Sequence, residues 1–103
     1  MGERTENVIP GNLTVTITEL AETIKSRVGA DPEVSYTARL LAAPVDELLK
    51  KVVEEATELA LAVKDDDHDH VRYEAADLLY HLLVLLQKTG ISLEELAGEL
   101  DAR

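Results

Sequence analysis

Two helical patterns joined by a polar loop decide the fold, and they occupy residues 45–89: VDELLKKVVEEATELALAVKDDDHDHVRYEAADLLYHLLVLLQKT. Apolar residues recur at intervals of three and four over 45–63, which is the period of an α-helix. Residues 65–69 contain no apolar side chain and predict a loop whose last aspartates can cap the next helix. That helix is expected over about 70–89, with Gly90 after it. Because the loop is short, the two helices should lie antiparallel.

Shorter helices are predicted on both sides of this hairpin. A Thr16-x-x-Glu19 pattern resembles a capping box at a helix start, and Ser92-x-x-Glu95 repeats the pattern near the end of the chain. Ser35 can cap a further short helix. No segment alternates with period two, so the sequence predicts an all-α fold of about four to five helices.

A chain of 103 residues has room for one domain, which we place at 14–103 behind a flexible N-terminal arm at 1–13. Such a chain buries only about two-thirds of its unfolded surface. Residues 78–86 are apolar around nearly the whole helix circumference and must be covered on every side. We therefore expect dimerisation, as a homodimer or higher homo-oligomer, to complete the bundle.

The charge balance limits the partners. The chain has 21 acidic and 10 basic residues, a net charge of −11, which disfavours nucleic-acid and anionic-membrane partners. A free nucleotide remains compatible, because a divalent cation can join carboxylates to phosphates. There is no cysteine, hence no disulfide or thiolate metal site. The longest apolar run is too short to span a bilayer, and no signal peptide is evident, so we expect a cytoplasmic protein.

Two acidic pairs suggest a metal site. Glu55 and Glu58 are three residues apart on the first long helix, and Glu74 and Asp77 repeat that spacing on the second. Antiparallel packing can bring the pairs face to face. Four converging carboxylates repel one another unless a cation lies between them. Oxygen ligands suit Mg²⁺, with Mn²⁺ as a substitute, and this ion is commonly shared with substrate phosphates.

Other polar residues near these pairs have structural interpretations. We expect His81 to be a hydrogen-bonded structural residue rather than a ligand, and Tyr80 to pack in the core. His68 and His70 lie in the aspartate-rich segment and are assigned to a solvated loop.

At this point the sequence resembles the phosphoribosyl-ATP pyrophosphohydrolases, within the MazG-like all-α nucleoside-triphosphate pyrophosphohydrolases. The resemblance rests on Glu-Glu-x-x-Glu at 54–58, on Glu-x-x-Asp at 74–77, and on the segments SYTARLL (35–41) and EAADLLYHLLVLL (74–86). It implies a dimeric enzyme of histidine biosynthesis that cuts phosphoribosyl-ATP into phosphoribosyl-AMP and pyrophosphate. It also implies that Glu55, Glu58, Glu74 and Asp77 hold Mg²⁺.

The remaining roles follow from charge and position. Glu54 or Glu58 is the candidate catalytic base. The candidate substrate-binding residues are Lys51, Lys50, Arg39, Tyr36 and Lys64, with Lys51 the strongest because it lies four residues before Glu55.

Two alternative functions stay open. The first is a house-cleaning pyrophosphatase of the same superfamily that acts on a non-standard nucleoside triphosphate. The second is a non-catalytic helical dimerisation module, which would leave the acidic pairs beside an apolar run without a purpose.

Overall fold

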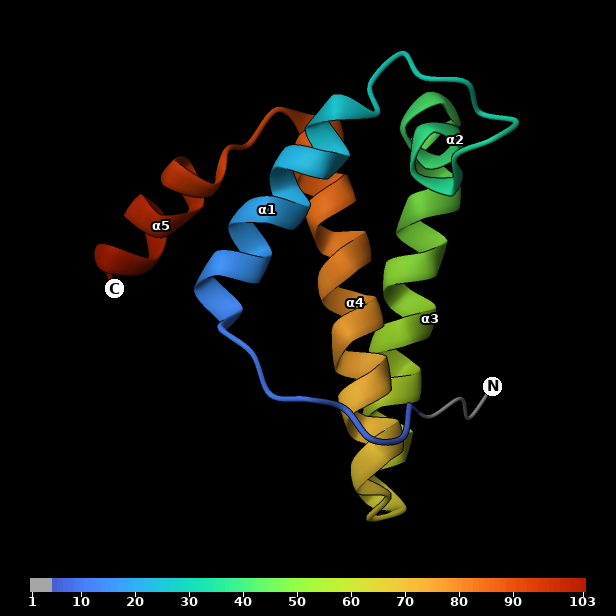
Figure 1. Cartoon of the computed structure of the whole chain (residues 1–103), viewed down its shortest axis with the longest axis vertical. Coiled ribbons are helices and arrows are strands. Elements are labelled where there is room, and N and C mark those ends of the chain that lie inside the picture. Colours follow the sequence, from blue (N-terminus) through green and yellow to red (C-terminus); the bar gives the residue numbers. More distant parts are fainter. Residues whose placement is uncertain (1–4) are drawn as a thin grey trace.

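The two long helices form the predicted antiparallel hairpin (Figure 1). In the computed structural model, which describes residues 5–103, α3 spans Val45–Lys64 and α4 spans His68–Thr89. The side chain of Asp67 caps α4 by accepting a hydrogen bond from the backbone amide of His70 at 3.2 Å. Gly90 ends α4 with a φ of 80°, a left-handed conformation that favours glycine. The short connection therefore fixes which turns of α3 face which turns of α4.

Three shorter helices complete the described chain: α1 (Leu13–Ser26), α2 (Tyr36–Ala42) and α5 (Leu93–Asp101). Each follows a polar side chain, that of Asn12, Ser35 or Ser92, which accepts a hydrogen bond from a free amide of the first turn. Helices α1 and α2 lie at the same end of the hairpin, and α5 stands away from it (Figure 1). There is no strand between residues 5 and 103, so the all-α prediction is confirmed for that part of the chain.

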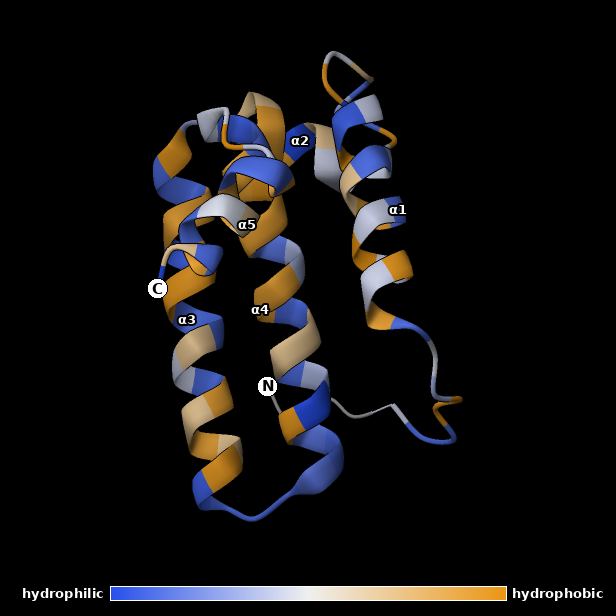
Figure 2. Cartoon of the chain, turned by 90° about the vertical axis from the view of Figure 1, so that its left-hand side faces the viewer, coloured by the Kyte–Doolittle hydropathy of each residue, from blue (hydrophilic) through white to orange (hydrophobic). Residues whose placement is uncertain are grey.

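The hydrophobic core lies at the end of the hairpin that α1 and α2 cover. Its buried members are Ile24, Leu40, Leu48, Leu83 and Val84. At the opposite end of the hairpin, the closing loop and the start of α4 are hydrophilic, whereas the end of α3 is largely hydrophobic (Figure 2). One end of α4 thus supplies the core, and the other end is free to carry polar groups.

Lys88 attaches α2 to the end of α4. Its Nζ atom donates hydrogen bonds to the carbonyl oxygens of Leu41 and Ala43, both at 2.6 Å. These carbonyls lie at the C-terminal end of α2, where a cation also complements the helix dipole. Lys88 therefore fixes the position of the helix that begins with Tyr36.

Two predicted helix starts were wrong. Helix α1 begins at Leu13 because Asn12 caps it, accepting a hydrogen bond from the amide of Val15 at 3.1 Å, so the Thr16-x-x-Glu19 pattern lies inside the helix. Helix α4 begins two residues earlier than expected, because the cap is Asp67. The second correction places His68, predicted to lie in a loop, together with His70 on the first turn of α4.

The predicted N-terminal arm is described in part, and the prediction on membrane spans can be compared with the helices. Residues 1–4 of the predicted arm lie outside the described residues, and residues 5–12 form no helix. Within residues 5–103, no helix is both long enough and apolar enough to cross a bilayer.

Candidate active site

The predicted acidic pairs face one another across the hairpin. Glu55 of α3 meets Asp77 of α4, and Glu58 of α3 meets Glu74 of α4, each group together with one histidine. We call Glu55, Asp77 and His81 the inner cluster, and Glu58, His70 and Glu74 the outer cluster. Within each cluster, one potential ligand atom per residue lies within 4.8 Å of the others. The order is that of antiparallel helices, with the inner cluster nearer the core.

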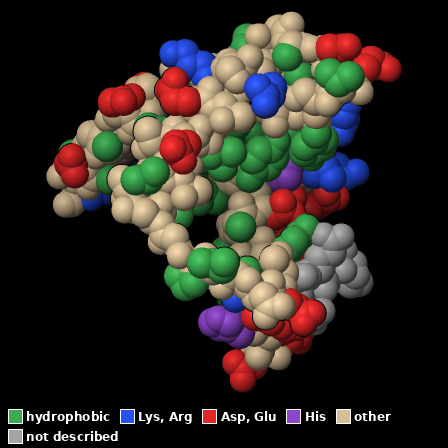
Figure 3. Space-filling view, viewed as in Figure 1, with side chains coloured by type: hydrophobic (Ala, Val, Ile, Leu, Met, Phe, Trp, Pro, Cys, Tyr) green, Lys and Arg blue, Asp and Glu red, His purple; other side chains and the backbone are tan. Residues whose placement is uncertain are grey.

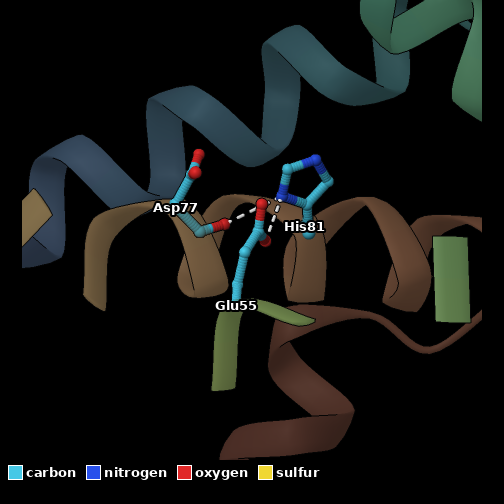
Figure 4. Close-up of side chains that lie close together, drawn as sticks. All are labelled: Glu55, Asp77 and His81. Atoms are coloured by element: carbon cyan, nitrogen blue, oxygen red, sulfur yellow. Dashed lines mark hydrogen bonds and ion pairs between the residues drawn. The ribbon is translucent and has the colours of Figure 1, made fainter. Parts of the chain in front are cut away.

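The inner cluster brings together the buried residues Glu55 and His81 and the partly buried Asp77 (Figure 4), and this setting raises the pKa of one carboxyl group. The pKa of Glu55 rises from 4.5 to about 8, first because burial penalises the charged form, then because of the charge of Asp77 and hydrogen bonding to its side chain. The positive charge of Lys51 opposes this rise. Without a cation, Glu55 therefore keeps its proton at neutral pH.

The hydrogen bonds of His81 define its protonation. Its Nδ1 atom lies 3.0 Å from the backbone carbonyl oxygen of Asp77, which can only accept, so Nδ1 carries the proton. Burial lowers the pKa of His81 and favours the neutral ring. The Nε2 atom is then an acceptor, and the hydroxyl of Tyr36 donates to it at 2.9 Å. Burial also raises the pKa of Tyr36, which keeps that hydroxyl protonated.

One buried oxygen of the inner cluster lacks a donor. His81 Nδ1 lies 2.6 Å from Glu55 Oε1, but its proton is directed at the Asp77 carbonyl, and no other described residue donates to this oxygen. Figure 4 shows the Glu55 side chain reaching from α3 to the turn of α4 that carries Asp77 and His81. A buried carboxylate oxygen without a partner is costly. A cation held by Glu55 and Asp77 would satisfy it, so this donor set fits Mg²⁺.

The outer cluster has two buried members and one partly exposed member. His70 Nε2 lies 3.1 Å from Glu74 Oε2 and 4.0 Å from Glu58 Oε2. The Glu74 and His70 side chains are buried, whereas the Glu58 side chain is 38% exposed. This cluster therefore has one side accessible to solvent.

The candidate substrate-binding residues occupy different positions. Lys51 is half-buried and its charge acts on Glu55, whereas Lys50 is exposed. Arg39 pairs with Glu47 at 2.6 Å and lies over the ring of Tyr36, 5.2 Å from its centre. Lys64 is at the last turn of α3, about 14 Å along the helix axis from Glu55 at about 1.5 Å per residue. Lys51 is thus the candidate cation nearest to the inner cluster.

One expectation near the site needs correction, and two others are confirmed. His70 is a buried residue of α4 in contact with Glu74, not part of a solvated loop. His81 is hydrogen-bonded through both ring nitrogens, which confirms that expectation, and it lies within the inner cluster. Tyr80 packs against the core and its hydroxyl bonds to Thr37, which confirms its packing role. The sequence spacing could have indicated that each histidine lies beside a carboxylate. His70 precedes Glu74 by four residues and His81 follows Asp77 by four, so each pair shares one face of the helix.

The surface beside the carboxylates is hollowed. Figure 3 shows a depression between the upper helices and the N-terminal segment. A cavity of about 330 Å³ is lined by Thr5, Val8, Arg72, Tyr73, Ala76 and Asp77. A second cavity, of about 480 Å³, lies between α1, α5 and the end of α4 and contains none of the predicted site residues. Of these two cavities in the described part of the chain, the smaller one borders a candidate ligand, Asp77.

Comparison with known proteins gives consistent matches. A family model described as phosphoribosyl-ATP pyrophosphohydrolase matches residues 17–103. The chain is 48% identical over 90 residues to a phosphoribosyl-ATP pyrophosphatase of Methylobacterium nodulans, covering 87% of this chain and 84% of that protein. It is 45% identical over 87 residues to the protein of the same name from Rhodobacter capsulatus, covering 84% of each. It is also 46% identical over 85 residues to the histidine biosynthesis bifunctional protein HisIE of Bacillus subtilis, covering 82% of this chain and 41% of that protein.

Proposed function

We propose that this chain, which belongs to the phosphoribosyl-ATP pyrophosphohydrolase family, hydrolyses phosphoribosyl-ATP to phosphoribosyl-AMP and pyrophosphate with the help of Mg²⁺. The observation that carries the proposal is the pairing of Glu55 with Asp77 and of Glu58 with Glu74 across the hairpin. The names of the relatives indicate the substrate. The family resemblance and the geometry therefore support the same reaction.

The metal set we propose is Glu55, Glu58, Glu74 and Asp77, all of which offer hard oxygen ligands. When bound, Mg²⁺ supplies positive charge that neutralises the charge developing on the departing pyrophosphate. The buried, unpartnered oxygen of Glu55 and the raised pKa of its carboxyl group support a role for this residue as a ligand.

The protein supplies a proton acceptor and positive charge. A water oxygen forms a bond to phosphorus, the bridging bond between the α and β phosphates breaks, and pyrophosphate leaves with the bonding electrons. We propose that Glu58 or Glu54 accepts the water proton. Glu58 is the better placed, because it lies in the outer cluster on the accessible side, whereas Glu54 is an exposed residue of α3.

The substrate would be held mainly by the cations near the inner cluster. We propose that Lys51 contacts phosphate, with Lys50 and Arg39 as further candidates, and with Lys64 farther away at the last turn of α3. Tyr36 presents a partly exposed ring and can stack on the adenine, while its hydroxyl holds His81.

We also propose that the active form is a homodimer in the cytoplasm. The supporting observation is incomplete coverage of the long helices, since Leu82 of α4 and Leu49 and Val53 of α3 are exposed apolar residues. Exposed apolar surface of this kind is typical of an interface. A closed two-fold dimer is the commonest way to cover it.

The decisive experiment measures pyrophosphate release from phosphoribosyl-ATP, ATP and a non-standard nucleoside triphosphate in parallel, with Mg²⁺ and with EDTA. We expect turnover of phosphoribosyl-ATP to exceed that of the others and to disappear in EDTA. Preference for the non-standard triphosphate would instead support the house-cleaning alternative. Full activity in metal-free buffer would overturn the metal assignment, and no activity on any substrate would favour the dimerisation module.

A further inference from the structure

The outer cluster contains a nitrogen donor that Mg²⁺ does not need. His70 lies on the first turn of α4, four residues before Glu74, so both side chains project from the same face of the helix. The residue is 8% exposed, and its Nε2 atom is directed at carboxylate oxygens from both long helices. Two ligands four residues apart on one helix, with a third from a neighbouring helix, form a common arrangement for a protein-bound transition metal.

The distances suit a small tetrahedral ion. Zinc binds imidazole nitrogen and carboxylate oxygen at about 2.0–2.2 Å, so two of its tetrahedral ligands lie about 3.4 Å apart. The His70 Nε2 atom is 3.1 Å from Glu74 Oε2 and 4.0 Å from Glu58 Oε2, which brackets that value. A small rotation of the partly exposed Glu58 side chain would bring its Oε2 atom from 4.0 Å to a ligand–ligand distance from His70 Nε2 that suits a tetrahedral ion. The open side of the cluster leaves room for a water molecule as the fourth ligand.

The two histidines near the carboxylates differ in their availability. Both ring nitrogens of His81 are engaged, Nδ1 by the carbonyl oxygen of Asp77 and Nε2 by the hydroxyl of Tyr36. Among the described residues, the Nε2 atom of His70 instead contacts the carboxylate oxygens of Glu74 and Glu58. Binding a metal at His81 would break two hydrogen bonds, whereas a metal at His70 Nε2 would replace a single contact, the one with Glu74.

We propose that Glu58, His70 and Glu74 form a binding site for a divalent transition metal, with Zn²⁺ as the preferred ion. Imidazole nitrogen favours Zn²⁺ over Mg²⁺, which prefers oxygen. The site is distinct in its ligand atoms from the all-oxygen set of the proposed reaction, although it shares two carboxylates with that set. If the proposed function holds, Zn²⁺ at His70 removes Glu58 and Glu74 from Mg²⁺ and inhibits hydrolysis. Binding itself does not depend on the reaction.

The test is calorimetric titration of the metal-stripped full chain with ZnCl₂ and, separately, with MgCl₂. We compare the unmodified protein with His70→Gln and with the matched control His68→Gln, because His68 is exposed and lies two residues away. His70→Gln should weaken Zn²⁺ binding at least about tenfold and leave Mg²⁺ affinity within about twofold. His68→Gln should change neither affinity. Circular dichroism verifies that each variant is folded.

A spectroscopic measurement identifies the ligand directly. The chain has three histidines, so the ring ¹⁵N signals can be assigned by single substitution. Zn²⁺ should shift the Nε2 signal of His70 and leave that of His81 in place. A shift at His81, equal Zn²⁺ affinity in His70→Gln and the unmodified protein, or the same loss for Zn²⁺ and Mg²⁺ would each overturn the inference. Failure of phosphoribosyl-ATP hydrolysis would not affect these readouts.

Discussion

The two halves of α4 differ in what covers them and in what they bury. The C-terminal half packs Leu83 and Val84 into the core beneath α1 and α2. The N-terminal half lies against α3 and buries the polar side chains of His70 and Glu74. Burial of apolar side chains stabilises the folded state, whereas burial of polar side chains destabilises it unless they are hydrogen-bonded. The C-terminal half of the helix therefore contributes most of the stabilising apolar burial, while the N-terminal half, together with His81 near the middle, holds buried polar groups that cost stability.

The largest expected effect is the loss of assembly or stability when a charge is placed on the apolar, C-terminal half of α4. Leu82 lies in that half and is 36% exposed in a single chain, so Leu82→Glu should be tolerated by a monomer. If a partner chain covers this residue, the buried charge should cost several kcal/mol. We expect the variant to dissociate or unfold and to lose activity, although no candidate ligand is changed.

Light scattering and thermal unfolding measure this outcome. Ile9→Glu is the control, because Ile9 is highly exposed and lies outside the helices, and it should leave mass and stability unchanged. A stable, active monomer of the unmodified protein at micromolar concentration would refute the dimer.

The second largest expected effect is the loss of turnover when a carboxylate of the inner cluster, on α3 or α4, is neutralised. Glu55→Gln keeps the size of the side chain and removes a negative charge from the inner cluster, so turnover should fall at least about a hundredfold while the fold persists. Asp77→Asn should act similarly. Asp66→Asn, in the loop, is the control and should retain near-normal turnover. Steady-state kinetics with circular dichroism separates loss of function from loss of structure, and normal turnover in both site variants would exclude this site.

Sequence predicted the geometry of the carboxylates better than that of the histidines. The period of three and four located α3 at its observed bounds, and the i, i+3 spacing placed each acidic pair on one face. The length of the short loop determines which carboxylate of α3 faces which carboxylate of α4. That length could be read from the sequence. The role of His70 was missed because its acidic surroundings resemble a loop, whereas the Asp67 cap extends the helix through it.

Contacts between distant segments could not be predicted in this way. Tyr36 bonds to His81 across 45 residues, and Lys88 holds the end of α2 across a similar separation. Neither contact follows a helical period, because each depends on how α2 packs against the finished hairpin. Local pattern therefore determined the helices and the facing pairs, while tertiary packing determined how the inner cluster is held.

The pH dependence of stability is a smaller effect that tests the inner cluster without substrate. Glu55 has a native pKa of about 8 against an ordinary value of 4.5, so between these values the native state binds more protons than the unfolded state. Its contribution to the free energy of unfolding therefore falls as pH rises through this window. The metal-free protein should lose stability, relative to Glu55→Gln, between about pH 5.5 and 8.

Added Mg²⁺ should reverse this trend, because it favours the ionised carboxylate. The gain in Tm from Mg²⁺ should increase with pH across the same window in the unmodified protein and much less in Glu55→Gln. Thermal scans at several pH values, with and without Mg²⁺, measure both slopes. A flat difference between the two proteins would show that Glu55 is ionised in the metal-free state.

The smallest effect concerns the Tyr36 hydroxyl, which connects α2 to His81 of α4. Tyr36→Phe keeps a ring that can stack on adenine but removes the donor to His81 Nε2. His81 can then place its proton on either nitrogen, and Nδ1 no longer donates consistently to the Asp77 carbonyl beside Glu55. Loss of such a supporting hydrogen bond weakens metal sites by about tenfold or more. The Mg²⁺ concentration for half-maximal activity should therefore rise by about that factor, with little change in Tm or in KM for the nucleotide.

Tyr80→Phe is the matched control for this experiment. It also removes one phenolic hydroxyl from the same aromatic group, since the Tyr36 and Tyr80 rings lie 6.3 Å apart. The lost hydroxyl bonds to Thr37 and not to the inner cluster, so Mg²⁺ dependence should stay normal even if Tm falls slightly. A structural role for Tyr36 would lower Tm and leave the Mg²⁺ dependence unchanged. Only a positioning role, acting through His81 on Glu55, changes the metal dependence in Tyr36→Phe alone.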